Sequence, residues 1–372
     1  MSPTAARDTT LTRALLITYD PDLIEVVQRL AALAHADLTV VSDVRAVRLD
    51  WASAPLVLLG IDAVPGCLEL RLPRRPDVVL VGDGVDDAAV WQQAVAIGAE
   101  RVVFFPEAEP WVVEVLADVA EGAAPEGPLV AVIGGRGGAG ATTLACSLAV
   151  TAGQAGWATL LVDGDPLGGG IDLVFGGEQT PGLRWGDLAS TQGRIPAAAL
   201  AAALPQMSGL SVLSWGRGDG PPLQGEAASA VLSAGRRASD LVVVDLPRVL
   251  DEAARVVLAQ ATLTLLVVPA EVRATAAAGR VAAAVRLLTS DLRVVVRGPA
   301  PTGLSGQAVA RELGVPLAGQ LRPEPRLAAA LDRGEPPPRR QRSPLACWAT
   351  GMLDGLFTGS LDGWAPAEAP VR

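Results

Sequence analysis

The chain has 372 residues and a formal net charge of −10, and all 30 of its basic Lys and Arg positions are arginine. The absence of lysine excludes every mechanism that needs one, such as a Schiff base or a lysine that holds a phosphate. Any phosphate chemistry must therefore use arginine, backbone N–H groups and metal. A single histidine and three widely spaced cysteines nearly exclude a zinc site and a serine–histidine–aspartate triad, and we expect the cysteines to be free buried thiols.

Length and hydropathy describe a chain of two or three globular domains without a membrane-spanning helix. Half of the residues are hydrophobic, yet no run of about 18 uninterrupted apolar residues occurs. The first residues, MSPTAARDTTLTRA, lack the apolar core of a signal peptide. We therefore expect a cytoplasmic protein, with peripheral attachment at the inner face of the plasma membrane, the septum or a pole as the alternative.

The first 120 residues alternate short runs rich in valine and leucine with helical patterns. We predict strands over residues 13–19, 38–42, 55–61, 78–81 and 101–105, and helices over residues 22–36, 86–97 and 110–120. This alternation is typical of βα units around a parallel sheet. The order and length of these elements resemble a response-regulator receiver domain, which has a flavodoxin-like fold.

The residues that a receiver uses to bind Mg²⁺ and to accept a phosphoryl group are missing from the expected positions. Those positions carry Thr18, Tyr19 and Gly60, with Phe105 in place of a lysine. Asp20 and Asp62 lie nearby in sequence but out of register. We therefore interpret residues 1–120 as a pseudo-receiver, a module for protein interaction or dimerisation. The alternative is a small α/β domain unrelated to receivers.

Charge and composition place a domain boundary after residue 120. Residues 1–120 hold 9 arginines against 18 acidic residues, whereas residues 121–372 hold 21 against 22. The segment EGAAPEGP between them is typical of a linker. We therefore predict a degenerate receiver-like domain over 1–120, a linker over 121–128, a second α/β domain over 129–343, and a C-terminal helix with a disordered tail over 344–372.

A phosphate-binding loop follows the linker. A buried strand over 129–133 leads into a glycine-rich run from Gly135 to Gly140, and a helix begins at about Ala141. Glycines let backbone N–H groups converge on an anion, and the helix N-terminus adds unsatisfied donors and its dipole. Thr142 occupies the position where a hydroxyl ligates Mg²⁺. Against the pattern G-x-x-x-x-G-K-[ST], the lysine position holds Ala141.

Two acidic strand ends follow the loop. The segment LLVDGD ends at Asp165, and the segment VVVDLP contains Asp245. Together with the loop RGGAGATT, they resemble the MinD/ParA family of deviant P-loop ATPases, whose loop reads K-G-G-x-G-K-[ST]-T. In this chain Arg136 replaces the leading signature lysine of the family, and Ala141 replaces its P-loop lysine. The resemblance spans about residues 128–340 and implies a P-loop NTPase domain with a mainly parallel sheet.

The resemblance to MinD and ParA assigns roles to residues of this chain. It implies that Asp165 orients the attacking water and that Asp245 binds Mg²⁺ through water, together with Thr142. It places Arg297 and Pro323 where the family contacts adenine. The implied ATP-binding residues are Gly135, Arg136, Gly137, Gly138, Ala139, Gly140, Ala141, Thr142, Thr143, Arg297 and Pro323.

A degenerate receiver joined to a degenerate MinD-like domain resembles the CpaE/TadZ group, and especially its actinobacterial septum-site-determining branch. This resemblance implies a nucleotide-dependent spatial regulator that positions the division septum or a pilus or secretion apparatus. It also implies an ATP-dependent homodimer with partners from that machinery. Without both lysines, we expect ATP and Mg²⁺ to bind but hydrolysis to be weak or absent. The alternatives are a nucleotide-free interaction scaffold and, less favoured, a fold-related ATP-dependent ligase.

The C-terminal region combines a short basic run with an apolar helix. After the basic run at 339–342, apolar residues repeat at helical spacing between Pro344 and Phe357. We expect this helix to dock on its own domain, with contact to a membrane surface as the alternative. Nucleic acid is not an expected partner, because the chain is acidic. Four arginines are close enough in sequence to form a local basic face: Arg273, Arg280, Arg286 and Arg293.

Overall fold

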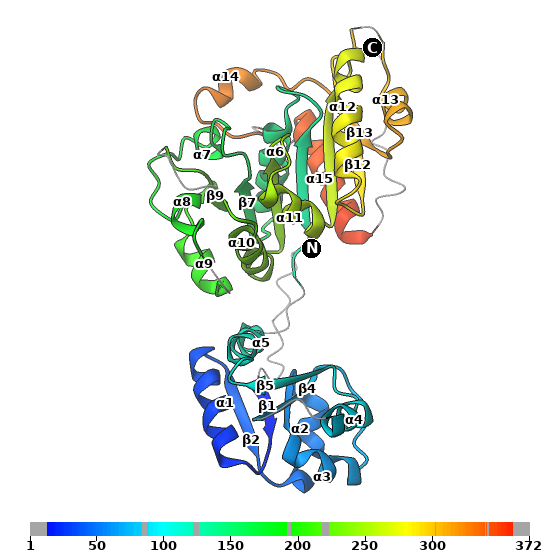
Figure 1. The fold of residues 1–372 in the computed structure, drawn as a ribbon. Helices are drawn as coiled ribbons and strands as arrows, with labels where there is room; N and C mark the ends of the chain where they lie inside the picture. The colour runs from blue at the N-terminus through cyan, green and yellow to red at the C-terminus, as the bar shows by residue number, and fades with distance from the viewer. Residues whose placement is uncertain are drawn as a thin grey trace. The chain divides into compact units, whose positions relative to one another are not determined.

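The computed structural model describes residues 13–83, 88–121, 126–191, 195–217, 223–301, 303–338, 340 and 342–359 (Figure 1). The chain divides into two compact units, residues 3–125 and residues 126–372. The division falls inside the segment 121–128, half of which lies outside the described residues, as do the tail after residue 359 and part of the basic run. Within the described ranges, no helix is long and apolar enough to cross a membrane.

The N-terminal unit is built on a parallel sheet with the strand order β2-β1-β3-β4-β5 (Figure 1). Its strands are β1 (Arg13–Ile17), β2 (Asp37–Val41), β3 (Val57–Gly60), β4 (Val78–Asp83) and β5 (Arg101–Phe105). Its helices are α1 (Pro21–Leu33), α2 (Arg48–Ser53), α3 (Val64–Glu69), α4 (Ala88–Ile97) and α5 (Glu109–Glu121), with 3₁₀ turns η1 (Val44–Ala46) and η2 (Ile61–Ala63). One hydrophobic cluster packs α1 and α5 on the sheet, and a second packs α2, α3 and α4.

The structure contains the strands and helices that the sequence pattern predicts in this unit, and it adds α2 and α3. Each added helix has only six residues, which is too few to display a helical repeat of apolar side chains. Each is anchored by a buried side chain, Trp51 in α2 and Cys67 in α3. These two anchors place α2 and α3 on the same face of the sheet as α4.

The C-terminal unit holds an eight-stranded sheet with the order β13-β12-β11-β6-β10-β7-β9-β8. All pairs are parallel except β8 with β9. The strands are β6 (Leu129–Gly134), β7 (Thr159–Asp163), β8 (Gln206–Met207), β9 (Leu210–Leu213), β10 (Leu241–Leu246), β11 (Leu263–Pro269), β12 (Leu292–Arg297) and β13 (Leu317–Leu321). Every residue of β6, β7, β10 and β11 is buried, because helices cover both faces of the sheet.

Two layers of helices enclose this larger sheet (Figure 1). The helices are α6 (Ala141–Gln154), α7 (Ile171–Val174), α8 (Trp185–Leu188), α9 (Ala197–Ala203), α10 (Gly225–Ala238), α11 (Glu252–Gln260), α12 (Val272–Val285), α13 (Gly306–Leu313), α14 (Leu327–Leu331) and α15 (Pro344–Thr358). One hydrophobic cluster joins α8 through α13 to the sheet, and the other joins α6 and α15 to its opposite face.

The C-terminal helix α15 packs on its own unit beside α6, as its apolar stripe predicts. Its buried apolar side chains include Leu345, Trp348, Met352 and Leu353. Near its end, the ring of Phe357 meets that of Trp157 edge to face, with 4.2 Å between the ring centroids. Cys347 on this helix is exposed, so the expectation of three buried thiols is wrong at that residue and correct at Cys67 and Cys146.

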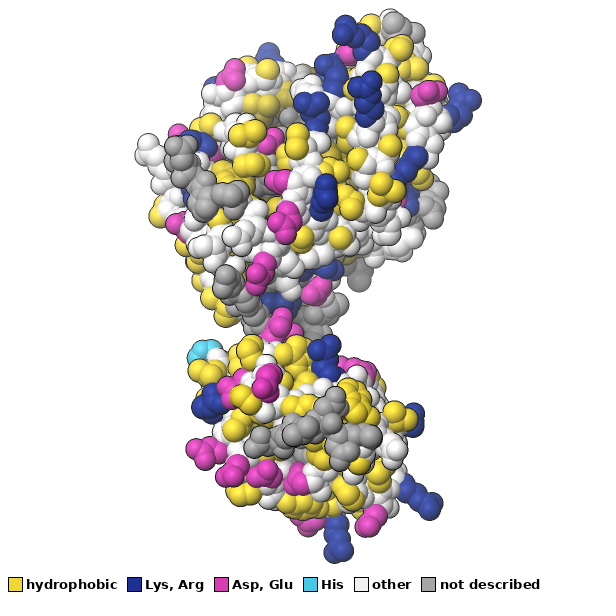
Figure 2. Space-filling model, in the orientation of Figure 1, with side chains coloured by type: hydrophobic (Ala, Val, Ile, Leu, Met, Phe, Trp, Pro, Cys, Tyr) yellow, Lys and Arg dark blue, Asp and Glu magenta, His cyan; other side chains and the backbone are white. Residues whose placement is uncertain are grey.

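Arginine side chains gather near α12 and α13 on the face of the C-terminal unit drawn in Figure 2. Of the four arginines that were close in sequence, Arg273 and Arg280 are exposed on α12. Arg286, which follows α12, is also exposed, and it donates a hydrogen bond to the last carbonyl of α13. Arg293 is buried and pairs with Asp291 at 2.9 Å. The four side chains therefore do not form one continuous basic face.

Candidate phosphate-binding site

The carboxyl ends of three central strands, β6, β10 and β7, meet at one edge of the larger sheet. The loop of residues 135–140 follows β6, β7 ends at Asp163, and Asp245 is the penultimate residue of β10. Asp245 and Asp163 are partners in the register of β10 and β7. Segments far apart in the sequence thus come together at the sheet edge where open α/β folds bind ligands.

The glycines of the loop have different structural roles. Gly138 and Gly140 have φ angles of +68° and +99°, in the left-handed region that only glycine adopts easily. Gly135 packs against α12, since a Cβ at that residue would come 2.7 Å from the Cβ of Ala278. Gly140 caps α6 without a side-chain hydrogen bond. The first N–H groups of α6 therefore have no acceptor within the helix.

A cavity of about 440 Å³ opens beside the loop. Asp165, Asp245 and Arg297 line it together with the loop. Of the loop residues predicted to bind ATP, Gly135 does not line this cavity. The others do: Arg136, Gly137, Gly138, Ala139, Gly140, Ala141, Thr142 and Thr143. A second cavity of about 620 Å³ shares Gly140, Thr143 and Arg297 with the first. Pro323 lines only this second cavity.

Thr142 and Asp245, the predicted metal ligands, lie close together on the wall of the first cavity. Asp245 is only 4% exposed. Burial raises the pKa of its carboxyl to about 7, the hydroxyl of Thr142 opposes that rise, and the negative charges of Asp163 and Asp165 add to it. A hydroxyl and a carboxylate are oxygen ligands that suit Mg²⁺, and a cation would reduce the repulsion among the three carboxylates.

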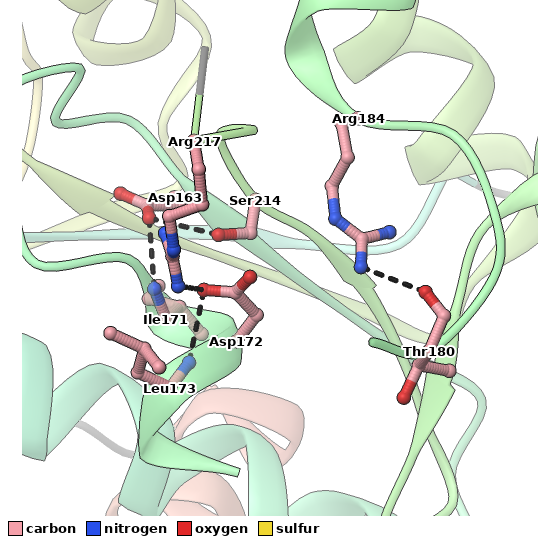
Figure 3. Close-up of polar contacts among 8 residues, drawn as sticks. All are labelled: Asp163, Ile171, Asp172, Leu173, Thr180, Arg184, Ser214 and Arg217. Carbon is pink, nitrogen blue, oxygen red and sulfur yellow. Dashed lines mark hydrogen bonds and ion pairs between the residues drawn. The ribbon is translucent and has the colours of Figure 1, made fainter. Parts of the chain in front are cut away.

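Asp163 holds the segment that follows β7 (Figure 3). One carboxylate oxygen of Asp163 accepts the N–H of Ile171 at 2.9 Å and the hydroxyl of Ser214 at 3.2 Å. The other oxygen accepts the N–H of Asp165 at 3.2 Å. Burial raises the pKa of Asp163 to about 6, although these hydrogen bonds oppose the rise. The role of Asp163 in holding this segment was not predicted from the sequence, although the D-x-D spacing of Asp163 and Asp165 was an available signal.

Asp165 and Asp172 have different surroundings. Asp165 lines the cavity, and its carboxylate accepts the N–H of Leu167 at 3.0 Å. Asp172 is 2% exposed and pairs with Arg217 at 2.8 Å (Figure 3). The residue predicted to orient water therefore faces the cavity, whereas Asp172 and Arg217 fix the start of α7.

Three arginines line the first cavity. Arg136 pairs with Glu271, its Nη2 lying 2.9 and 3.1 Å from the two carboxylate oxygens. Arg248 follows β10, and its Nη2 is 3.9 Å from the place of a Cβ on Gly137. Arg297 reaches the loop from the end of β12. Arg248 is not among the residues predicted from the sequence, and the all-arginine composition was the only hint that a further guanidinium lies beside the loop.

The smaller sheet carries a different arrangement at its carboxyl end. The hydroxyl of Thr18 and the N–H of Tyr19 donate to the two carboxylate oxygens of Asp62, at 2.8 and 2.6 Å. The carboxylate of Asp62 lies over Gly60, where an added Cβ would overlap it. Asp62 therefore occupies the space beside residue 60, although it is two residues away from that position in the sequence. Asp20 caps α1. Among the described residues, no group of three or more His, Cys, Asp or Glu side chains is arranged to hold a metal ion.

Solved structures share the fold of the C-terminal unit. A ParA family ATPase from Chlorobium tepidum matches with a TM-score of 0.54 and 15% identity, covering 63% of this chain and 99% of that one. MinD of Aquifex aeolicus matches with a TM-score of 0.51 and 21% identity, covering 66% and 100%. The MinC:MinD complex of the same organism gives 0.52 and 21%, covering 66% and 98%. The predicted MinD/ParA-like fold is thus confirmed.

Sequence relatives cover both units. A family model described as the Rv3660c-like, CheY-like N-terminal domain matches residues 17–127, which confirms the receiver-like fold of the N-terminal unit. The Mycobacterium tuberculosis protein Rv3660c is 44% identical over 341 residues, covering 91% of this chain and 96% of the relative. Protein MT3760, from another strain of that species, matches to the same extent. With this identity over nearly the whole of both proteins, the chain belongs to the Rv3660c-like family.

Proposed function

We propose that the chain is a nucleotide-dependent switch of the MinD/ParA type, which binds ATP with Mg²⁺ and hydrolyses it slowly or not at all. One observation carries the proposal: the loop, the Thr142–Asp245 pair and three arginines converge on a single cavity. A loop that binds anions beside a hydroxyl and a carboxylate is what a metal-bound phosphate requires.

The residues of the two cavities fit ATP and Mg²⁺. The start of α6 offers N–H groups that have no acceptor within the helix. The Nε atoms of Arg136 and Arg297 are buried without a hydrogen-bond partner, so an anion would satisfy donors that the fold leaves open. Thr142 and Asp245 would hold Mg²⁺. The adjoining cavity lined by Pro323 would receive the base.

Ala141 is the reason to expect slow hydrolysis. It places no charge where a P-loop lysine neutralises the charge that develops on the transferred phosphoryl group. A charge-assisted contact of this kind contributes about 1.5–3 kcal/mol. Asp165 faces the cavity and would orient a water molecule, and bound Mg²⁺ would polarise the phosphate oxygens. We therefore expect nucleotide binding to be retained and turnover to be reduced.

The proposed role is spatial regulation through protein partners. MinD of Aquifex aeolicus is a cell division protein, and it forms a complex with MinC. By analogy, we propose an ATP-dependent homodimer that positions the division septum or a pilus or secretion apparatus, in the manner of the CpaE/TadZ group and its actinobacterial branch. The pseudo-receiver would recruit the partners. The place of action would be the cytoplasm, including the inner face of the plasma membrane.

Equilibrium titration of the purified full chain with a fluorescent ATP analogue and Mg²⁺ tests nucleotide binding. The wild type should bind, and Thr142→Ala and Asp245→Ala should weaken Mg²⁺-dependent binding by tenfold or more, since about 1.4 kcal/mol corresponds to a factor of ten. Thr151→Ala is the matched control, because this hydroxyl lies farther along the same helix and donates to the carbonyl of Ser147. No binding by the wild type would leave the nucleotide-free scaffold as the function.

Light scattering and imaging test the rest of the proposal. The molar mass of the purified chain should double in ATP and Mg²⁺ and remain that of a monomer without nucleotide. A fluorescent fusion of the full chain should localise to a septum or a pole. A mass that ignores nucleotide, together with a diffuse distribution, would contradict the spatial switch even if ATP binds.

A further inference from the structure

We propose that Arg297, from the end of β12, supplies the positive charge toward the phosphates that the lysine-free loop lacks. The inference rests on the nucleotide binding proposed above and names the residue on which that binding most depends. The sequence motif alone suggested that Arg297 contacts the base. Its position in the fold points to the phosphate loop instead.

The backbone of Arg297 is fixed by the strands on either side. In the register of the sheet, Arg297 is paired with Pro269 of β11 and Leu321 of β13. Its carbonyl accepts the N–H of Ala270 at 2.9 Å, and the next N–H, of Gly298, donates to the carbonyl of Leu321 at 2.8 Å. A side chain on this anchor has a defined origin at the carboxyl edge of the sheet, near the loop that follows β6.

The side chain of Arg297 lies against Gly140. A Cβ on Gly140 would come 3.3 Å from Nη1, 3.6 Å from Cδ and 4.0 Å from Cζ of Arg297. The guanidinium is therefore beside the residue that directly precedes Ala141, the position where the family carries its lysine. The φ of +99° and this close approach both favour glycine at residue 140.

The guanidinium of Arg297 also has unused hydrogen-bonding capacity. Its Nε is buried without a partner, and within the described ranges its side chain makes no hydrogen bond or ion pair. Arg136 also has a buried Nε without a partner, but its Nη2 is held by both carboxylate oxygens of Glu271. Arg248 differs as well, since it is exposed. Of the three, Arg297 is the cation whose donors most need an anion.

The chemistry of the group favours phosphate over base. A guanidinium is a donor with no acceptor, so it cannot receive the amino hydrogens of adenine. Toward a phosphate it offers two parallel charge-assisted N–H donors. Arg297 lines the cavity at the loop as well as the adjoining one, so its side chain lies where the phosphate end of a nucleotide in these cavities would be bound.

The test compares ligands that differ only in their phosphates. Affinities of the full chain for ATP, ADP and adenosine are measured by competition against the fluorescent analogue. Arg297→Ala should weaken ATP and ADP by about tenfold or more and adenosine by less than about twofold. Arg280→Ala, an exposed arginine of α12 that lines neither cavity, is the matched control and should change none of the three. Arg297→Lys, which retains the charge, should recover part of the loss.

A double-mutant cycle identifies the charge that is replaced. Adding Ala141→Lys to Arg297→Ala should restore most of the ATP affinity, whereas Ala141→Lys in the wild type should add much less, because two cations that serve the same phosphates are not additive. Equal losses for ATP and adenosine on Arg297→Ala, or fully additive effects in the cycle, would overturn the inference and leave nucleotide binding intact. A wild type that binds no nucleotide would remove both.

Discussion

The carboxyl ends of the two sheets differ, although each lacks charged residues that the sequence resemblances place there: the acids and the lysine of a receiver in the smaller sheet, and the P-loop lysine in the larger one. In the smaller sheet, the hydroxyl of Thr18 and the N–H of Tyr19 both donate to the carboxylate of Asp62, which covers Gly60. In the larger sheet, Ala141 removes a charge, but the cavity remains and arginines from other strands line it. Whether such a site can still bind a ligand therefore depends on its remaining polar groups, which either form hydrogen bonds with one another or are left without a partner.

Gly60→Asp should have the largest effect, because it attempts to restore the receiver acid where Asp62 already lies. The new Cβ would overlap the Asp62 carboxylate and lie 2.6 Å from the hydroxyl of Thr18. We expect a loss of about 3 kcal/mol in the free energy of unfolding of the N-terminal unit, within the range for overpacking. Urea unfolding of the full chain measures it.

The double variant Gly60→Asp with Asp62→Ala is the control for this experiment. It should recover the part of the lost stability that comes from the overlap with the Asp62 carboxylate, whereas the overlap with Thr18, whose Cβ would lie 2.7 Å from the new Cβ, remains. Stability of wild-type level in the single variant would show that the smaller sheet end is open to new side chains, and the contrast between the two sheets would then disappear.

Asp245→Asn should stabilise the chain at pH 8 in the absence of nucleotide and metal. The pKa of Asp245 is about 7 in the folded chain, against an ordinary value of 3.8. Between pH 3.8 and pH 7, Asp245 therefore keeps a proton in the folded chain that it has released in the unfolded chain. The free energy of unfolding therefore falls as pH rises toward 7 and stays low above it. Asparagine avoids that cost, so we expect a gain of about 1–3 kcal/mol.

Thermal unfolding at pH 5.5 and pH 8 checks this prediction. The wild type should lose stability between the two pH values more steeply than Asp245→Asn, while the variant binds ATP with Mg²⁺ less tightly. Parallel pH profiles for the two proteins would mean that Asp245 is already charged and stabilised in the folded chain. The polar groups at the end of the larger sheet would then satisfy one another, as those of the smaller sheet do.

Ala141→Lys should convert the loop into a better ATPase. A lysine there would add a charge-assisted contact to the phosphates, with an expected gain of about tenfold in turnover measured by phosphate release. Ala141→Ser, at the same residue, is the matched control, because it adds a polar group but no charge. If the wild type already turns over as fast as Ala141→Lys, the missing lysine does not limit hydrolysis.

Arg136→Ala should have the smallest effect in the isolated chain. The pair with Glu271 is partly exposed, with side-chain exposures of 37% and 48%, and such pairs contribute about 0–1 kcal/mol. ATP affinity should fall less than in Arg297→Ala, in the same titration. A larger loss at Arg136 would reverse the ranking of the two arginines.

The sequence predicted the parts of the site that each belong to one local pattern. A strand that runs into a glycine loop, and an aspartate at the end of a buried valine run, indicate groups at the carboxyl edge of a parallel sheet. Thr142, Asp165 and Asp245 could be placed there because strand direction alone determines the edge. The β/α order of both units followed from the same alternation.

The contacts that decide the chemistry were beyond the sequence pattern. Ser214, the residue after β9, donates to Asp163, and Arg297 reaches Gly140 from the end of β12. The first pair of residues is 51 positions apart in the sequence, and the second is 157 positions apart. Contacts of this kind depend on the direction of the side chains rather than on the periodicity of the sequence. Asp62 shows the same limit of the sequence pattern. It lies two residues after the position where a receiver carries its acid, yet the turn η2 brings its carboxylate back over Gly60.

The bond between the carboxylate of Asp163 and the N–H of Ile171 has a mechanical consequence. This hydrogen bond holds together the two ends of the loop formed by residues 164–170. The conformational entropy that is lost on closing the loop is therefore part of the folding free energy. Asp165 lies inside this closed loop. A change of backbone shape within residues 164–170 would re-aim the carboxylate of Asp165 while the hydrogen bond between Asp163 and Ile171 still holds the two ends of the loop together.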